Sequence, residues 1–246
     1  MADFSTPHIV LFCATAAFIA LTMWAVSKMN RTWQNVMFIL GALACAGGIF
    51  FRYGMGLSWE GGITLKTLGT QLLQVCNFNI VLVVLMLVPR FELARQYSIF
   101  FSMFAASTTL VSIPNSWASL NWYDTTVLNS WFNHAFAIAL PLWMLAARRL
   151  KPKREYVLKV TACVVGYFLI SAAVTTLLIK LEVIPSGSSY SFIFDTEGIP
   201  VFETLYKLIP VPCFYLLPLV PVMAGFFSLL VVAFKRYEVK PYGKKI

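Results

Sequence analysis

The sequence predicts an all-α, polytopic membrane protein with seven transmembrane helices, an outside N-terminus and a cytoplasmic C-terminus. The chain of 246 residues is 59% apolar, has a mean hydropathy of +0.77 and is only 12% charged, whereas soluble domains average about 25% charged residues. Its apolar residues also fall into seven runs, each close to the roughly 20 residues that cross a bilayer as a helix. The distribution of lysine and arginine between these runs then sets the orientation.

The first four runs have recognisable ends. The run 8–28 has no basic segment before it and no obvious small-residue cleavage site, so we interpret it as a retained helix rather than a signal peptide. Arg52 closes the second run, and Pro114 stops the fourth because proline cannot continue a helix. The first four expected helices are 8–28, 34–52, 66–88 and 96–114.

The last three runs, 127–147, 157–180 and 208–234, complete a single membrane domain over residues 1–246, without a linker or a convincing internal repeat. A basic loop separates the first two of them. The outer loop at 181–207 mixes turn formers with aromatic residues, which favours a segment at the membrane interface; a flap over the outer mouth of the bundle is the alternative. The last run is expected to be irregular in its outer half, because it contains four prolines: Pro210, Pro212, Pro218 and Pro221.

Basic residues gather on alternate loops. With the N-terminus outside, 15 of the 19 lysines and arginines lie in the inner segments, as the positive-inside rule requires. The net charge of +9 is thereby explained by cytoplasmic loops next to anionic lipid headgroups, and we expect no nucleic-acid partner. The five cysteines fall within expected helices at no metal-ligand spacing, so neither a disulfide framework nor a metal site is expected. No cofactor is expected either.

One stretch of the third run is unusually polar. Gln71, Gln74, Asn77 and Asn79 surround Cys76 within a segment that is otherwise apolar. Polar groups at membrane depth are costly unless they face a protein interior or a water-filled cavity. The stretch therefore predicts a lined site, in which the thiol is the only atom that can act as a nucleophile.

A histidine is expected at the same depth as this thiol. If the third helix begins near Thr67, Cys76 lies about 14 Å from its outer end, and His134 lies about 12 Å into a fifth helix that begins near Thr126, at 1.5 Å per residue. A cysteine and a histidine supply a nucleophile and a general base, the pairing that forms acyl-enzyme intermediates. The alternative is that Cys76 only fills space, as most buried cysteines do.

Further polar residues are candidates for the same site. The amides of Gln74, Asn77, Asn79 and Asn133 can stabilise a tetrahedral oxyanion or orient the imidazole. Arg52 either binds the phosphate of a lipid substrate or marks the membrane boundary as a snorkelling side chain, and Asn115 faces the site or belongs to a helix stop.

These elements resemble the YwaF-like integral membrane proteins. The resemblance is carried by four segments in the same order, over about residues 35–235: Gln74–Val75–Cys76–Asn77, Pro114–Asn115, Trp131–Phe132–Asn133–His134 and Tyr156–Val157–Leu158–Lys159–Val160. That family includes the vertebrate membrane acyltransferase that makes arachidonoyl ether phospholipids. The resemblance implies a plasma-membrane acyltransferase in which Cys76 and His134 form a catalytic pair. Gln74 departs from the pattern, because some members carry histidine there.

The expected function is transfer of an acyl chain from a phospholipid ester to a lipid or lipid-anchored acceptor. Cys76 would carry the chain as a thioester, with the site in the outer half of the membrane. The alternative is a transporter or channel for a small solute, lined by the amides of the third helix; such proteins often show internal repeats. A ligand-binding or scaffolding protein is a third interpretation, although the short loops leave little room for a partner.

Overall fold

The computed structural model describes residues 5–54, 70, 72–111 and 120–239, and these residues contain helices but no strands. The all-α prediction is therefore confirmed for this part of the chain. The helices are α1 (Thr6–Lys28), α2 (Arg31–Gly54), α4 (Val75–Leu85), α5 (Glu92–Tyr97), the π-helix η1 (Ser98–Ser102), α6 (Met103–Val111), α7 (Thr125–Ala146), the 3-10 turn η3 (Arg154–Tyr156), α8 (Val157–Lys180), α9 (Pro200–Leu208), the 3-10 turn η4 (Phe214–Leu216) and α10 (Leu219–Ala233).

Three helical stretches of the described residues are both long and apolar enough to cross a membrane, which indicates a membrane protein. They are Thr6–Lys28, Arg154–Lys180 and Phe214–Ala233. Each contains at least 20 residues, which corresponds to about 30 Å or more at 1.5 Å per residue. The apolar helix Val75–Leu85 has 11 residues and is shorter than a span. Seven crossings and their direction remain predictions.

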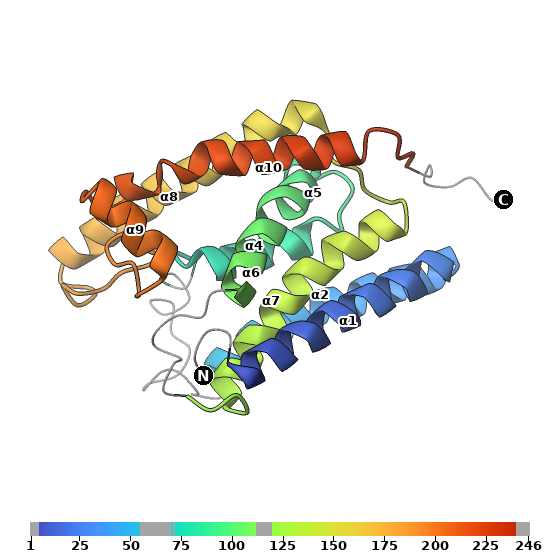
Figure 1. Cartoon of the computed structure of the whole chain (residues 1–246), viewed down its shortest axis with the longest axis horizontal. Coiled ribbons are helices and arrows are strands. Elements are labelled where there is room, and N and C mark those ends of the chain that lie inside the picture. Colours follow the sequence, from blue (N-terminus) through green and yellow to red (C-terminus); the bar gives the residue numbers. More distant parts are fainter. Residues whose placement is uncertain (1–4, 55–69, 71, 112–119, 240–246) are drawn as a thin grey trace.

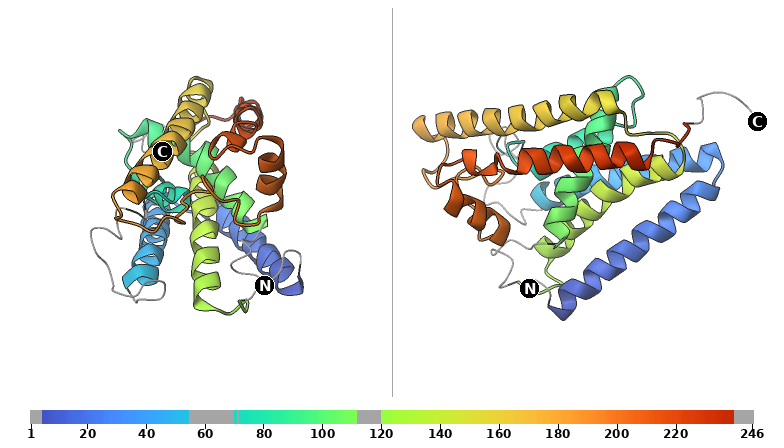
Figure 2. Two further views of the ribbon diagram at one scale, coloured as in Figure 1. Left: turned by 90° about the vertical axis from the view of Figure 1, so that its left-hand side faces the viewer. Right: turned by 45° about the horizontal axis from the view of Figure 1, so that its top comes forward.

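The helices form two inclined groups with a third set between them (Figures 1 and 2). In one group α7 packs against both α1 and α2, and in the other α8 packs against α10. The short helices α4 and α5, with η1 and α6, lie between the groups, and η1 contacts α7, α8 and α10. Because α4 also contacts α2 and α7, its residues reach the interior of the molecule.

Close approach of α2 to α7 depends on glycines. A Cβ atom added at Gly41 would lie 2.7 Å from Leu140 and 2.8 Å from Trp143, and one added at Gly48 would lie 1.9 Å from Asn133 Oδ1. Small residues let membrane helices approach in this way. The Trp143 indole, held against α2, donates to Thr22 Oγ1 of α1 at 2.8 Å, so α7 is packed from both sides.

The last expected run is interrupted, as its prolines predict. The helix α9 ends at Leu208, residues 209–218 form turns and the 3-10 turn η4, and α10 begins only at Leu219. A proline removes one backbone donor and clashes with the preceding turn, so a continuous helix from 208 cannot form. The amphipathic helix α9 inside the outer loop was not expected from the sequence.

Segments that the basic-residue pattern places in the cytoplasm meet at one end of the molecule. Arg95 donates to the carbonyl of Arg149 at 2.6 Å, and the fully buried Gln96 donates to the carbonyl of Lys151 at 2.9 Å. The Lys151 ammonium donates to the carbonyl of Lys235 at 3.0 Å. Three of the expected inner segments are thus joined by hydrogen bonds.

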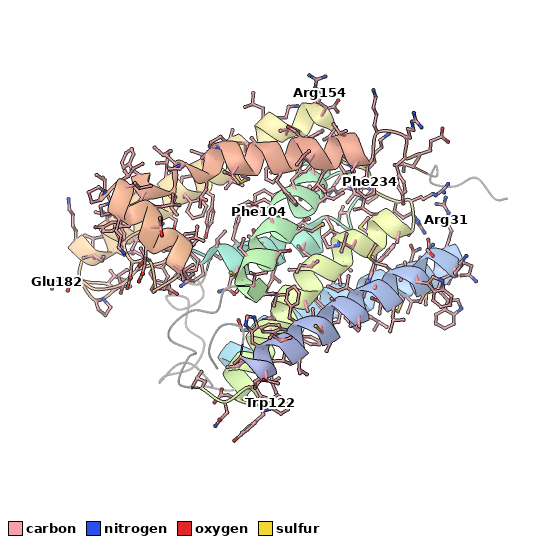
Figure 3. The ribbon with its side chains drawn as sticks, in the orientation of Figure 1. Arg31, Phe104, Trp122, Arg154, Glu182 and Phe234 are labelled. Atoms are coloured by element: carbon pink, nitrogen blue, oxygen red, sulfur yellow. The ribbon has the colours of Figure 1, made fainter. Side chains whose placement is uncertain are left out.

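Arg149 joins the first inner loop to this cluster. It is 8% exposed and donates to Gln34 Oε1 at 3.2 Å. In Figure 3, Arg154 lies at the top, Arg31 at the right and Phe234 between them, whereas Trp122 lies at the bottom and Glu182 at the left. The inner and outer positions predicted from charge therefore separate to two sides of the molecule.

Glu92 is the carboxylate at the centre of this cluster, and its protonation at low pH should destabilise the fold. It pairs with Lys153 at 2.9 Å and Arg95 at 3.1 Å. Burial alone would raise the pKa of Glu92, but the hydrogen bonds from Lys153 and Gln96 and the nearby positive charges hold it below its ordinary value of 4.5. A lowered folded-state pKa stabilises the fold above the unfolded-state pKa, and this contribution is lost as pH falls through the folded-state value.

We expect Glu92→Gln to lower the free energy of unfolding at pH 7 by about 1 kcal/mol, since the pair is partly exposed. Melting temperature in detergent, measured from pH 7 to below 4, should fall more for the wild type than for the variant. Parallel curves for the two proteins would contradict the assignment. Glu155→Gln is the control, because Glu155 is exposed and forms no ion pair within the described residues.

Candidate functional site

Cys76 lies at the start of a helix. It is the second residue of α4, whose N-cap is Gln74 in an extended conformation (φ −82°, ψ 120°), and its side chain is half-buried. The sequence places this residue deep inside a helix that begins near residue 67, but residues 72–74 form a turn instead. The depth of Cys76 therefore cannot be counted from a continuous helix, and its position relative to His134 depends on how α4 and α7 pack.

Ser191, from the outer loop, fixes the beginning of α4. Its buried hydroxyl accepts the Val75 N–H at 2.7 Å and donates to the Leu73 carbonyl at 2.5 Å. The Ser191 N–H donates to Gln74 Oε1 at 3.2 Å. The first N–H groups of a helix lack partners within the helix, so a serine 116 residues away in the sequence performs the role that a local capping residue usually has.

Aromatic residues of α8 and η4 strengthen this attachment. Tyr167 donates to the Leu72 carbonyl at 3.0 Å and stacks on Phe78 at 4.6 Å between ring centroids. Tyr215 donates to the Phe192 carbonyl. The loop around Ser191 therefore packs onto the bundle beside α4. Nothing in the sequence near residue 191 indicates this partner, because the serine lies among other turn formers.

Ser191→Ala should destabilise the protein. The substitution removes the partner of the buried Val75 N–H, and leaving one buried donor unsatisfied costs about 1–3 kcal/mol. We expect a lower free energy of unfolding in detergent titrations and faster proteolysis of the loop. Ser186→Ala is the matched control, since Ser186 is exposed in the same loop; equal stability of the two variants would contradict the role given to Ser191.

His134 lies in the middle of α7 and is 8% exposed. Its Nδ1 is 2.7 Å from the Ser130 carbonyl oxygen. A carbonyl can only accept, so Nδ1 carries the proton of the neutral ring and Nε2 carries the lone pair. This is the tautomer that a general base requires, with Nε2 as the basic atom.

The helices α4, η1 and α7 each carry buried polar atoms. These three elements contact one another in pairs. Four side-chain oxygens on them are buried without a hydrogen-bond partner within the described structure: Asn79 Oδ1, Ser98 Oγ, Ser102 Oγ and Asn133 Oδ1. Buried polar atoms are hydrogen-bonded in the great majority of cases, and π-helical turns are frequent at functional sites. Each of these oxygens is therefore available to a polar group of a ligand.

The remaining predicted residues differ in how much the structure says of them. Asn77 is buried on α4, and Asn133 is buried against the backbone of Gly48. Arg52 belongs to the last turn of α2, with its side chain outside the described residues. Asn115 also lies outside them. Sequence reasoning missed the serines of η1, because hydroxyls in an apolar run are common in membrane helices.

Within the described part of the chain, the other cysteines and the acidic residues do not form a second site. All five cysteines are free thiols. The described residues contain no group of three or more histidine, cysteine, aspartate or glutamate side chains that could hold a metal ion.

The sequence was compared with known proteins. A model of the TMEM164 family matches residues 3–233, nearly the whole chain. No curated protein and no solved structure matches the sequence.

Proposed function

The chain belongs to the TMEM164 family of membrane proteins, and we propose that it is an acyltransferase that uses Cys76 and His134. The reaction moves an acyl chain from a phospholipid ester to a lipid or lipid-anchored acceptor. The resemblance of the segments around Cys76 and His134 to the YwaF-like proteins supports this chemistry.

One observation carries the proposal. The helix that bears Cys76 packs directly against the helix that bears His134, and the same two helices carry the unpaired oxygens of Asn79 and Asn133. A nucleophile, a base with a defined tautomer and amides for a developing charge are the parts that acyl transfer requires. The position of Cys76 in the first turn of α4 adds to this, since the positive end of a helix dipole stabilises negative charge.

The first step forms the acyl-enzyme. His134 Nε2 takes the proton from Cys76, and the Sγ atom attacks the carbonyl carbon of the lipid ester. Amide N–H groups of Asn77, Asn79 or Asn133 stabilise the oxyanion. A rotation of the side-chain amide by 180° exchanges its oxygen and nitrogen. An asparagine with an unpaired Oδ1 can therefore also present its N–H groups at the same place. The carbon–oxygen bond of the ester then breaks, and the leaving alkoxide takes the proton back from His134.

The second step delivers the chain. A hydroxyl or amine of the acceptor loses its proton to His134 Nε2 and attacks the thioester carbonyl. The carbon–sulfur bond breaks, and the Cys76 thiolate is protonated by His134. The chain is transferred without net oxidation or reduction, and neither step needs a cofactor.

The membrane placement follows from the same proposal. Seven helices with the N-terminus outside put the polar cluster of Arg95, Gln96 and Arg149 in the cytoplasm and α4's first turn in the outer half of the membrane. The adjacent acyl donor is then a phospholipid of the outer leaflet. A plasma-membrane location accords with this arrangement.

Acyl transfer can be measured directly with purified protein in proteoliposomes. The vesicles contain phosphatidylcholine with a deuterated sn-2 chain and a panel of lysophospholipids that differ in headgroup. We expect mass spectrometry to find the deuterated chain on an acceptor, increasing with time and protein.

The transporter interpretation predicts a different result. Folded protein, judged by size-exclusion chromatography, would then move no deuterated chain to any acceptor, while small polar solutes would leave the same vesicles faster than from protein-free ones. That combination would overturn the acyltransferase proposal.

A further inference from the structure

An apolar groove runs along the outside of α4, on the side that faces α8. It encloses about 820 Å³, within the range of about 300–1,000 Å³ typical of small-molecule pockets. Phe78, Leu82 and Leu85 of α4 form one wall, and Cys163, Gly166 and Ile170 of α8 form the other. The groove ends at the loop between α4 and α5.

Cys76 is not one of the residues that line this groove. Phe78, Leu82 and Leu85 are spaced four and three residues apart, so they share one face of α4. Cys76 precedes Phe78 by two residues, which turns it by about 200° around the helix axis at 3.6 residues per turn. Cys76 is absent from the groove lining, although its thiol interacts electrostatically with two lining residues, Tyr97 and Tyr167.

A positive charge lies at one end of the groove. Arg90 and Glu92 both line this end. The Glu92 carboxylate is already paired with Arg95 and Lys153, whereas Arg90 is exposed, lies 4.9 Å above the Phe91 ring and forms no ion pair with a carboxylate of the described residues. The end of the groove thus offers a guanidinium to an anion.

The residues around the groove indicate which kind of ligand it binds. The second wall belongs to Arg154–Lys180, one of the stretches long and apolar enough to cross a membrane, so we expect the groove to open to the hydrocarbon of the bilayer. Arg90 belongs to an inner loop by the charge pattern, next to a leaflet that carries anionic headgroups. Guanidinium groups bind phosphate through paired hydrogen bonds.

We propose that this groove binds one phospholipid of the cytoplasmic leaflet, with an acyl chain between α4 and α8 and its phosphate on Arg90. We distinguish this lipid from the acyl donor, because Cys76 is absent from the groove lining and the donor of the proposed reaction lies in the outer leaflet. The lipid chain fills the space between the apolar side chains of α4 and α8 that line the groove. This proposal is independent of the acyl-transfer reaction.

Photo-crosslinking in nanodiscs tests the proposal. The probe is phosphatidylglycerol with a diazirine in one acyl chain, and crosslinked peptides are identified by mass spectrometry. We expect labelling of residues 78–85 and 163–170. Gly166→Phe should fill the groove and lower this labelling about tenfold, as expected when a buried apolar ligand is excluded. A Cβ at Gly166 meets no atom within 4 Å, and the same holds for Gly225 of α10, so Gly225→Phe is the matched control and should label like the wild type.

The charge is tested separately. Arg90→Gln should lower labelling by phosphatidylglycerol about tenfold, through the loss of a charge-assisted hydrogen bond, and Arg154→Gln should not. A diacylglycerol probe, which has no phosphate, should label the wild type and Arg90→Gln equally. Equal phosphatidylglycerol labelling of the wild type and Gly166→Phe would overturn the proposal. An equal loss of labelling in Gly166→Phe and Gly225→Phe would also overturn it.

Discussion

Cys76→Ala is expected to abolish acyl transfer and the covalent intermediate. Without the thiol no thioester can form, and removal of a catalytic nucleophile lowers the rate by on the order of 10³-fold or more. Wild-type protein incubated with deuterated phosphatidylcholine should gain the mass of one acyl chain, and hydroxylamine, which cleaves thioesters, should remove it. The Cys76→Ala protein should gain no such mass in the same spectrum.

The structure provides the controls for this experiment. Cys76 is half-buried, so its replacement by alanine removes few contacts and should leave the melting temperature nearly unchanged. Cys13→Ala removes an exposed thiol of α1 and should keep both the adduct and the transfer rate. Transfer by Cys76→Ala at the wild-type rate would eliminate the covalent mechanism, even if acyl transfer itself is confirmed.

Features that depend on composition could be predicted from the sequence. The apolar runs gave helices at α1, α2, α7 and α8 within three residues of the expected ends, because a bilayer and a close-packed interior both require long apolar helices. The interruption before α10 was predicted by its prolines. The alternation of basic loops indicated which helix ends meet, and the hydrogen bonds of Arg95, Gln96 and Lys151 join three of those segments.

Features that depend on distant partners could not be predicted. The helix α4 begins at Val75 because Ser191 accepts the Val75 N–H. The sequence around Val75 does not indicate a hydrogen-bond partner 116 residues away. The π-helix η1 likewise depends on packing between α4, α7 and α10. The oxygens of Ser98 and Ser102 were missed for this reason, since their burial follows from the tertiary arrangement rather than from the residues beside them.

Polar side chains on α4 also proved to have different roles. Gln74 was expected to stabilise an oxyanion, but its Oε1 accepts the Ser191 N–H, which engages half of its amide in holding the loop. Asn79 keeps an unpaired buried oxygen and is the stronger candidate for contact with a substrate. A sequence pattern finds such a polar cluster, whereas only packing separates its structural members from those available to a ligand.

His134→Gln is expected to lower the rate of thioester formation by about 10²–10⁴-fold, the usual contribution of a general base. Glutamine is similar in length and can still donate a hydrogen bond, as His134 does to the Ser130 carbonyl, but it cannot take a proton from Cys76. The acyl adduct on Cys76 should therefore form far more slowly, although the thiol is present. The rate is followed by quenching samples at intervals and measuring the adduct by mass spectrometry.

The matched control is the same substitution at the other histidine. His8 Nε2 lies 2.8 Å from the Leu110 carbonyl, a contact that a glutamine amide can reproduce, and His8 belongs to the first turn of α1. His8→Gln should therefore form the adduct at nearly the wild-type rate. If His134→Gln forms it equally fast while both variants keep the wild-type melting temperature, another group must deprotonate Cys76, and the catalytic pair would have to be reassigned even though the nucleophile stands.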